Sequence, residues 1–472
     1  MIATLRSELS HEWSVVKPIL IRNLILKIGV LLVVWVVSST DNQTEKSNFV
    51  LNQVYNPNNS TIGSGIVALA DWDGVYFLHA ILVDYTNLKQ FAFYPGFPTL
   101  VKGILAVATS IPGLSSILAG VSRGLLVIFT GSSLNFLLHL ANNWLVYQWL
   151  RARSFTQKQA SFAALTFAMG GNMLYHLTFY SESSYMFFTL LSLWVLAKAG
   201  NNPGQMPFGR FVLLTIFFAY TGLIRSVGLV NGAYLGYPLV LELVYALVKH
   251  KQPRRAAGLL LRIFIVIACF FTPMVFLFFK TRRLFCHGPT AEDPYYSAPA
   301  FCNSPTGFFY SHIQEVYWFV RFMDYLQNPY HMDQWLWAFV SCIVASIWLK
   351  QAYQRAGVKG LLTIHIPEFL ANHNLMSPRI LEMPDLVIFS MQYIGYYCYA
   401  HLASVERFWS ATPAYYMFLV VAQEALVRLG SGHDKDHPPS KFKQSLKYLI
   451  PLNLTIRQFV VPIYHSTRIY PV

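Results

Sequence analysis

Charged residues are scarce in this chain. Asp, Glu, Lys and Arg make up 12% of its 472 residues, whereas 55% are hydrophobic. A soluble domain carries about 25% charged residues, and a chain with half that share cannot cover its surface with polar groups. Lipid must cover much of the surface instead, which predicts a membrane protein.

Motifs for nucleotides and catalytic metals are also missing. The sequence contains no glycine-rich phosphate loop and no Gly-x-Ser-x-Gly turn. No zinc-ligand spacing relates the scattered histidines His139, His176, His365 and His401. These absences argue against nucleotide-driven and zinc chemistry.

Cysteine is rare as well, and five residues are too few for a disulfide framework. Cys269, Cys342 and Cys398 lie inside apolar segments, which predicts inert packing residues. Cys286 and Cys302 flank a polar, proline-rich loop. These two can pair if the loop faces an oxidising lumen.

Long apolar segments are abundant, and a transmembrane helix needs about 20 such residues. The predicted spans are 19–38, 98–119, 124–150, 159–178, 183–198, 208–223, 226–248, 259–279, 332–350, 385–403 and 408–429, with a weaker one at 447–465. The first lacks the pattern of a cleavable signal. The sequence thus predicts an all-α polytopic membrane protein with roughly 10–12 transmembrane helices, and residues 1–472 as a single transmembrane domain.

The net charge of +14 is concentrated at the ends of apolar segments, as in residues 249–255. This distribution is typical of the positive-inside rule, and no nucleic-acid partner is predicted. The basic stretches 151–158, 249–255 and 350–359 are therefore assigned to the cytosol. The opposite, luminal side then receives residues 180–184, 223–226, 281–316 and 404–410.

One early segment cannot cross the membrane in this topology. If residues 39–97 are luminal, counting every span would place 249–255 in the lumen. The segment 98–119 is interrupted by Ser110-Ile111-Pro112-Gly113. A Pro-Gly break favours a re-entrant or interfacial helix pair there.

The first luminal loop, 39–97, carries sequons at Asn42, Asn58 and Asn59, which are compatible with a lumen and indicate no more. Residues 66–83 then have a helix-like period, which predicts an amphipathic helix lying in the membrane surface.

Two acids of that loop, Asp71 and Asp73, flank Trp72. They are either charges of a helix start and a solvated face, or catalytic carboxylates. A carboxylate can deprotonate a sugar hydroxyl as it attacks an activated carbon. Two acids can also hold a divalent metal, but residues i and i+2 do not share a helix face. A single working acid is therefore the more natural interpretation.

Further polar residues at the luminal level have two interpretations each. The run Phe91–Pro98, with Tyr94 and Pro95, is an aromatic anchor or a wall of the active site. Glu182 caps the following helix or lines the pocket. Arg225 and Arg407, with Arg123 as a weaker third, snorkel to headgroups or bind a lipid phosphate.

Several runs, in this order, resemble the family of the second mannosyltransferase of glycosylphosphatidylinositol (GPI) anchor assembly. They cover about residues 19–430: Asp71–Leu78, Phe91–Pro98, Asn135–Leu137, Tyr180–Glu182, Arg225–Val230, Tyr310–Trp318, and Arg407-Phe408 before Ser410–Pro413.

The resemblance implies the GT-C glycosyltransferase fold, a multi-span enzyme of the endoplasmic reticulum membrane whose active site faces the lumen. It implies transfer of mannose from dolichyl-phosphate mannose to the first mannose of the GPI precursor glycolipid. The new linkage is α-1,6 and the reaction inverts the anomeric carbon. No cofactor is expected beyond this lipid donor, and the sequence leaves open a small membrane partner subunit.

The resemblance also implies residue roles. Asp73 matches the family acid and becomes the expected base, with Asp71 second. The family has more polar residues at the positions of Gly74 and Val75. This difference puts the acceptor contacts of this chain in doubt. Arg225, Arg407 and Arg123 are expected at the donor phosphate, Trp72, Tyr94, Pro95 and Glu182 at the substrate pocket, and Cys286–Cys302 as a disulfide, with no metal.

Other classes are weaker. A related GT-C transferase could act on another lipid-linked glycan or on protein. A transporter or scramblase would place charges mid-span and show paired repeats, and no internal repeat is evident. A non-catalytic subunit of a membrane complex is the remaining class.

Overall fold

The structure is a computed structural model. It describes residues 14, 16–29, 31–32, 68–70, 73–113, 115–116, 121–168, 173–248, 251–286, 299–303, 308–317, 412–413, 415–417 and 419–420. Every regular element in this part of the chain is a helix, which confirms the all-α prediction. Contacts divide the chain into two compact units, and each is described by itself. The prediction of one domain stays a prediction.

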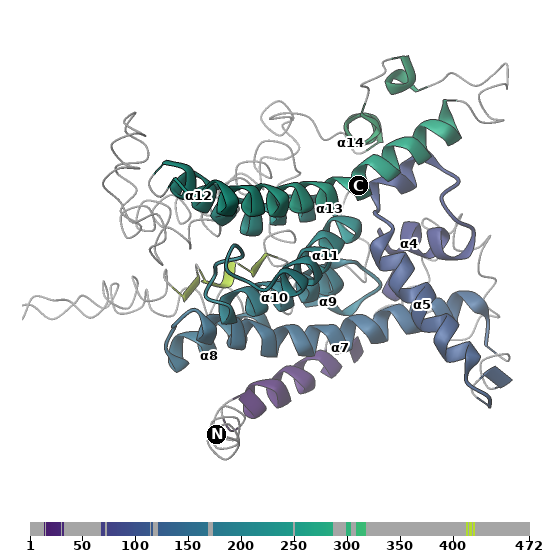
Figure 1. Cartoon of the computed structure of the whole chain (residues 1–472). Coiled ribbons are helices and arrows are strands. Elements are labelled where there is room, and N and C mark those ends of the chain that lie inside the picture. Colours follow the sequence, from purple (N-terminus) through teal and green to yellow (C-terminus); the bar gives the residue numbers. More distant parts are fainter. Residues whose placement is uncertain are drawn as a thin grey trace, which may run out of the picture. The chain divides into compact units, whose positions relative to one another are not determined.

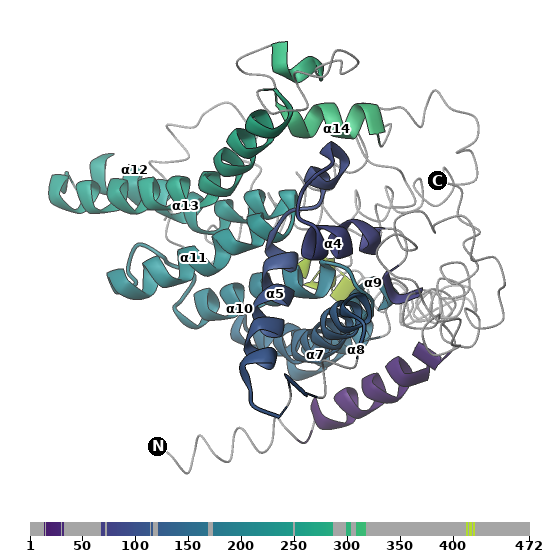
Figure 2. The same cartoon turned by 90° about the vertical axis from the view of Figure 1, so that its right-hand side faces the viewer.

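The first unit comprises Met1–Asp84, Phe97–Trp194 and Trp409–Val472. Its elements are η1 (Ala68–Ala70), α4 (Asp73–Leu82), α5 (Gly96–Ser110), α7 (Arg123–Ala152), α8 (Gln157–Ala168), α9 (Met173–Leu177) and most of α10 (Glu182–Lys198), after a helix at 16–29. The long helix α7 is capped by Ser122, whose hydroxyl accepts from the Leu125 N–H. α8 and α4 both pack against it, and α7 and α8 lie side by side in Figure 2.

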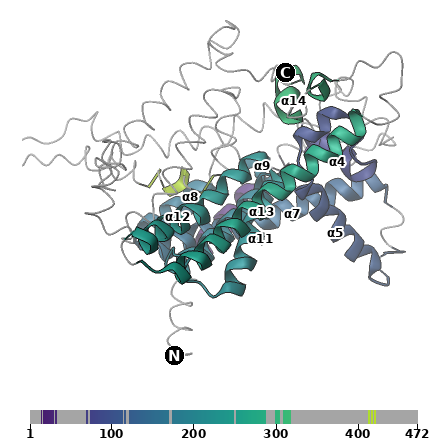
Figure 3. The same ribbon diagram turned by 45° about the horizontal axis from the view of Figure 1, so that its top comes forward.

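The second unit comprises Tyr85–Gly96 and Val195–Phe408. Its elements are η2 (Leu88–Ala92), α11 (Phe208–Ile224), η3 (Ser226–Gly232), α12 (Ala233–Val248), α13 (Pro253–Phe285), η5 (Ala300–Asn303) and α14 (Phe309–Tyr317). The 33-residue helix α13 is the central helix of this unit, because α11 and α12 both pack along it (Figures 1 and 3). α14 packs against η2, which in turn contacts α13.

Several predicted spans are helices in the structure. Among the described residues, three helical stretches are long and apolar enough to cross a membrane: Arg123–Ala152, Ser226–Val248 and Pro253–Phe285. α13 is much longer than the predicted span 259–279, because Pro253 starts it at its first position and the charged Arg282 and Arg283 still fit in its last turn. Spans 332–350, 385–403, 447–465 and most of 408–429 lie outside the described residues.

Apolar side chains point outward along these helices. On α13 the exposed stripe includes Leu260, Phe264, Ile267, Phe271 and Phe279, spaced so that they share one face. Water would penalise such a stripe, whereas hydrocarbon accepts it. The burial pattern therefore supports a membrane protein independently of composition.

The first helix has its polar residues inside and its apolar residues outside. Asn23 and Lys27 are at most 1% exposed, while Ile25 and Ile28 are 65% and 49% exposed. The Lys27 ammonium donates to the carbonyl of Ala168, the last residue of α8, over 2.9 Å. A helix end in hydrocarbon needs such a donor for its last carbonyls, so Lys27 serves as a helix cap from another span.

Two helices of the first unit bear on the predicted segments 98–119 and 66–83. α5 ends at Ser110, and Gly113 has a φ of +85°, so the helix stops at the predicted break. In the predicted helix 66–83, the described residues form the short η1 and the helix α4. Its apolar residues Phe77, Leu78 and Ile81 are buried. That face packs on α7 and Phe97, and the position of this helix in the membrane surface stays a prediction.

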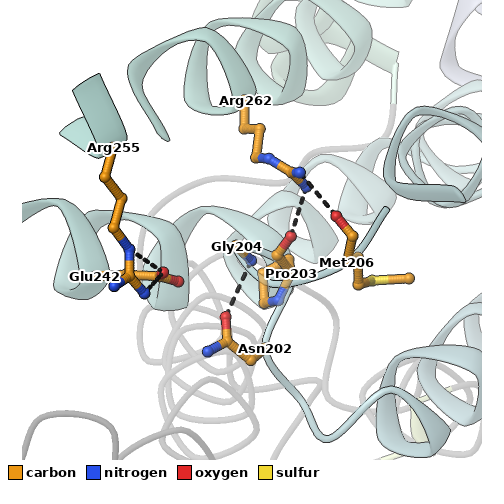
Figure 4. Close-up of polar contacts among 7 residues, drawn as sticks. All are labelled: Asn202, Pro203, Gly204, Met206, Glu242, Arg255 and Arg262. Atoms are coloured by element: carbon orange, nitrogen blue, oxygen red, sulfur yellow. Dashed lines mark hydrogen bonds and ion pairs between the residues drawn. The ribbon is translucent and has the colours of Figure 1, made fainter. Parts of the chain in front are cut away.

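A polar clip holds the loop before α11 in the second unit (Figure 4). Arg262 of α13 donates to the carbonyls of Pro203 and Met206 at 2.8 and 2.7 Å. Glu242 of α12 is 2% exposed and forms an ion pair with Arg255. Gly204 lies directly against the Glu242 carboxylate, which would have to shift for a larger residue. The clip joins α11, α12 and α13 at the end that carries the basic residues assigned to the cytosol.

Candidate functional site

The predicted base Asp73 is the first residue of α4 and is partly buried. A carboxylate at this position is stabilised by the positive end of the helix dipole. One turn later, burial and then the charge of Asp73 raise the pKa of Tyr76. Asp73 therefore stands beside a phenol that stays neutral and can donate a hydrogen bond.

The start of α4 is docked on the turn that precedes α10. A Cβ at Gly74 would lie 3.2 Å from the carbonyl oxygen of Phe179, so the two backbones are in close contact. The Phe179 N–H donates to the Leu69 carbonyl at 2.8 Å. This single turn thus supports both η1 and the first turn of α4, and it fixes where the Asp73 backbone lies.

Asn135 of α7 is hydrogen-bonded to that turn. Its fully buried side-chain amide donates to the carbonyls of Thr178 and Tyr180 at 2.6 and 2.7 Å. Two helix turns on, Asn142 donates to the Ser183 carbonyl at 2.9 Å. Buried amide donors of this kind satisfy carbonyls that the irregular turn leaves outside helix hydrogen bonding. Asp73 is therefore positioned by a chain of contacts that runs from α7 through the turn to α4.

Glu182 lies in the same region as the first residue of α10 and is 0% exposed. This place at the helix start fits the capping interpretation, because the N-terminal partial charge stabilises a carboxylate. Its role as a pocket residue remains a prediction.

In the second unit, Arg225 stands at the corner between α11 and η3. Its backbone is extended, with φ −148° and ψ 143°, and it is partly buried. Gly228 makes the corner possible, since a Cβ there would collide with the backbone of Thr221. Asn231 donates to the Thr221 hydroxyl at 3.1 Å. The corner is therefore a tightly packed mount for the Arg225 side chain.

The aromatic run 91–96 is docked on the same corner. The Tyr220 hydroxyl donates to the Gly96 carbonyl at 2.9 Å. A Cβ at Gly96 would lie 2.7 Å from the backbone of both Leu223 and Ile224. This fit places Pro95 and the buried Tyr94 beside the end of α11.

Tyr310 of α14 completes this cluster. Its hydroxyl is 2.9 Å from the Ser226 hydroxyl, and its ring meets Tyr94 edge to face at 5.9 Å. Burial raises the pKa of Tyr310, against smaller opposing effects of the Ser226 hydrogen bond and the Arg225 charge. Burial and then Tyr310 raise the pKa of Tyr94. Both phenols therefore remain neutral next to Arg225.

Cys286 and Cys302 form a disulfide, as the resemblance implied, with their Cα atoms 5.6 Å apart. Arg282 donates to the carbonyls of Phe301 and Cys302 at 3.3 and 3.4 Å. Lys280 lies 5.0 Å from the centre of the Tyr85 ring, a cation–π contact. The cationic end of α13 is thus tied both to the disulfide loop and to the segment before η2.

The structure leaves some predicted residues apart. Arg123 is the exposed first residue of α7, and its side chain is not among those that anchor Asp73. Asp71, Trp72 and Arg407 lie outside the described residues. Within the described ranges, no three His, Cys, Asp or Glu side chains gather as metal ligands.

Other site residues were missed from sequence. Asn135 was noted only as part of a resemblance, and Tyr310 likewise received no role. His139 and His176, described above as scattered, are both buried with ring centres 5.3 Å apart. The usable signal was the polar stripe Asn135, His139 and Asn143 at four-residue spacing on an otherwise apolar helix.

Helices with outward-facing apolar side chains define an integral membrane protein built of helices. A carboxylate held at a helix start is a group that an enzyme can use. A family model described as Mannosyltransferase (PIG-V) matches residues 18–449. The chain belongs to this family and is a mannosyltransferase.

Curated relatives agree with this assignment. The chain is 25% identical to GPI alpha-1,6-mannosyltransferase 2 of Homo sapiens over 76% of this chain and 74% of that protein. It is 23% identical to GPI mannosyltransferase 2 of Drosophila melanogaster over 74% of this chain and 78% of that protein. Among solved structures, an Archaeoglobus fulgidus oligosaccharyltransferase aligns over 93% of this chain and 55% of its own, with 12% identity and a TM-score of 0.40. A likeness this slight carries no argument.

Proposed function

We propose that this mannosyltransferase adds the second mannose of the GPI precursor, through an α-1,6 linkage, to the first mannose of that glycolipid. The observation that carries the proposal is the match to relatives named for this step along about three quarters of the chain. Family membership also favours a transferase over the transporter, scramblase or subunit interpretations. The fold proposed with it is GT-C, and the location is the endoplasmic reticulum membrane with the site facing the lumen.

The proposed donor is dolichyl-phosphate mannose. In the reaction, the 6-hydroxyl oxygen of the acceptor mannose attacks C1 of the donor mannose from the face opposite the phosphate. The bond from C1 to the phosphate oxygen breaks, and dolichyl phosphate leaves with the electron pair. The hydroxyl proton passes to Asp73, and the configuration at C1 inverts. Asp73 suits this role because its backbone is fixed by the turn at Phe179.

The leaving phosphate needs positive charge, and Arg225 with Arg407 is proposed to supply it without a metal ion. Arg225 has a rigid mount and two neutral phenols nearby. Tyr94, Pro95 and Glu182 are proposed to shape the substrate pocket. Asp71 is kept as a secondary acid and Trp72 as its neighbour in the pocket.

The test is an Asp73→Asn variant assayed in membranes with labelled dolichyl-phosphate mannose and the one-mannose GPI precursor. Loss of a general base is expected to slow transfer by about 10²- to 10⁴-fold, while expression and the level of folded protein stay normal. Asp84→Asn is the matched control, because Asp84 is exposed just beyond the other end of α4 and asparagine tolerates its φ of +82°.

Two outcomes would contradict the proposal. Wild-type membranes that transfer no mannose to this acceptor would refute the function itself. A fully active Asp73→Asn enzyme would refute the assignment of the base. The same assay with and without a chelator tests metal independence, since a strict metal requirement would abolish transfer in the chelated sample.

A further inference from the structure

Three segments distant in sequence meet at Arg225. The α11–η3 corner supplies Arg225 and Ser226, the docked aromatic run supplies Tyr94, and α14 supplies Tyr310. The Arg225 guanidinium is close enough for its charge to act on Tyr310. Tyr310 touches both of the other segments.

The contacts of Tyr310 bear directly on how Arg225 is held. Its hydroxyl binds the side chain of Ser226, the residue next to Arg225 in the chain. Its ring packs edge to face on Tyr94, which is tied to the end of α11 through Gly96. Tyr310 therefore links the Arg225 corner to α14 and to the aromatic run.

α14 is itself well anchored, which makes this restraint effective. Phe309 is fully buried and packs edge to face on Phe91 of η2. η5 precedes α14 and is held to α13 by Arg282 and by the disulfide at Cys302. α14 is thus anchored at η2 and, through η5, at the end of α13.

We propose that Tyr310 is a positioning residue that sets the side chain of Arg225 for binding the phosphate of the lipid donor, acting through its hydrogen bond to Ser226. The inference rests on the proposed function, in which Arg225 binds that phosphate. A neutral phenol suits this role, because it can share a hydrogen bond with the Ser226 hydroxyl without competing with the phosphate for Arg225.

The test measures inhibition by dolichyl phosphate, the released product, in full-length enzyme in membranes. The inhibition constant reports phosphate binding and does not depend on how much enzyme is active. Tyr310→Phe keeps the ring and removes only the hydroxyl. It is expected to raise the inhibition constant about tenfold, as one lost hydrogen bond to a positioned group would. Ser226→Ala removes the other partner and is expected to give the same increase.

The double variant Tyr310→Phe with Ser226→Ala should be no worse than either single variant, because both remove one interaction. In an Arg225→Lys background, which weakens phosphate binding by itself, Tyr310→Phe should add less than about twofold. The control is Tyr245→Phe on α12, a partly buried tyrosine away from this cluster, which should leave the constant unchanged.

Unchanged inhibition in Tyr310→Phe, or additive effects with Arg225→Lys, would overturn the proposal. A lower rate in Tyr310→Phe with an unchanged inhibition constant would also overturn it, since that result describes a merely structural residue. Failure of the proposed function is separate: it is seen when wild-type enzyme transfers no mannose. If transfer occurs but Arg225→Lys binds dolichyl phosphate normally, Arg225 is not the phosphate ligand and Tyr310 cannot act through it.

Discussion

At the scale of single residues, the candidate site depends on buried polar side chains that act on backbone groups. Asn135 is the clearest case, because one side chain serves two carbonyls of the turn beneath α4. Lys27 plays a similar part at the end of α8. In a membrane interior, water does not replace such partners, so each carries more weight than an equivalent contact on a soluble surface.

Asn135→Ala is therefore expected to destabilise the protein and slow transfer together. The carbonyls of Thr178 and Tyr180 lose this donor, and the Thr178 carbonyl still accepts from the Tyr180 N–H, so the expected total cost is about 1–3 kcal/mol. Asn142→Ala removes only one such bond, to Ser183, and should cost about half as much. Thermal unfolding of detergent-solubilised protein gives the stabilities, and the mannose-transfer assay gives the rates. Equal stabilities of Asn135→Ala and wild type would rule out the supporting role of Asn135.

At the scale of elements, glycines set how closely helix ends approach. Gly96 and Gly228 both bring backbone against the last turns of α11. Gly103, in contrast, has open space around it although it lies on the same helix as Gly96. The two positions on α5 therefore form a matched pair, one in contact and one free.

Gly96→Ala should displace the aromatic run from α11, because the atoms it meets belong to the backbone of Leu223 and Ile224 and cannot rotate away. Overpacking of this kind costs about 1–3 kcal/mol. Gly103→Ala should be neutral or stabilising by up to about 1 kcal/mol, since alanine favours helix. Unfolding temperatures of both variants and their transfer rates test this. Equal behaviour of the two variants would show that the close approach at Gly96 has no energetic consequence.

At the scale of the whole molecule, topology is the main open prediction. α5 has 15 residues, which at 1.5 Å each gives about 22 Å. The hydrocarbon core is about 30 Å thick, so α5 alone is too short to cross. It stops where Ser110-Ile111-Pro112-Gly113 interrupts the apolar segment.

A glycosylation acceptor inserted at residue 121 should accordingly be modified in the lumen, as should one placed in the first loop. An acceptor inserted after Lys251, next to the basic cluster, should stay unmodified. The readout is a gel shift that endoglycosidase reverses. If the acceptor at residue 121 is not glycosylated and a protease cuts there from the cytosolic side, segment 98–119 crosses the membrane after all.

The sequence by itself determined the class of the molecule and predicted which acid serves as its base. Scarce charge and long apolar segments predict membrane helices from local composition alone, and α7, α10 and α11 occur within a few residues of the predicted bounds. The break after Ser110 was also predicted, because proline and glycine interrupt a helix through their own local backbone geometry. The family runs added Asp73 and Arg225, again as local patterns.

Only the tertiary structure decided how those residues are held. Lys27 and Ala168 are 141 positions apart, Asn135 and Thr178 are 43 apart, and Ser226 and Tyr310 are 84 apart. Periodicity reports which face of a helix is apolar, but a hydrogen bond across such a separation depends on which helices pack together. For the same reason, the helical period of 66–83 indicated an apolar face on α4 but not that this face packs on α7 and Phe97. A hydrophobic face does not specify its partner, since protein interior and hydrocarbon satisfy it equally well.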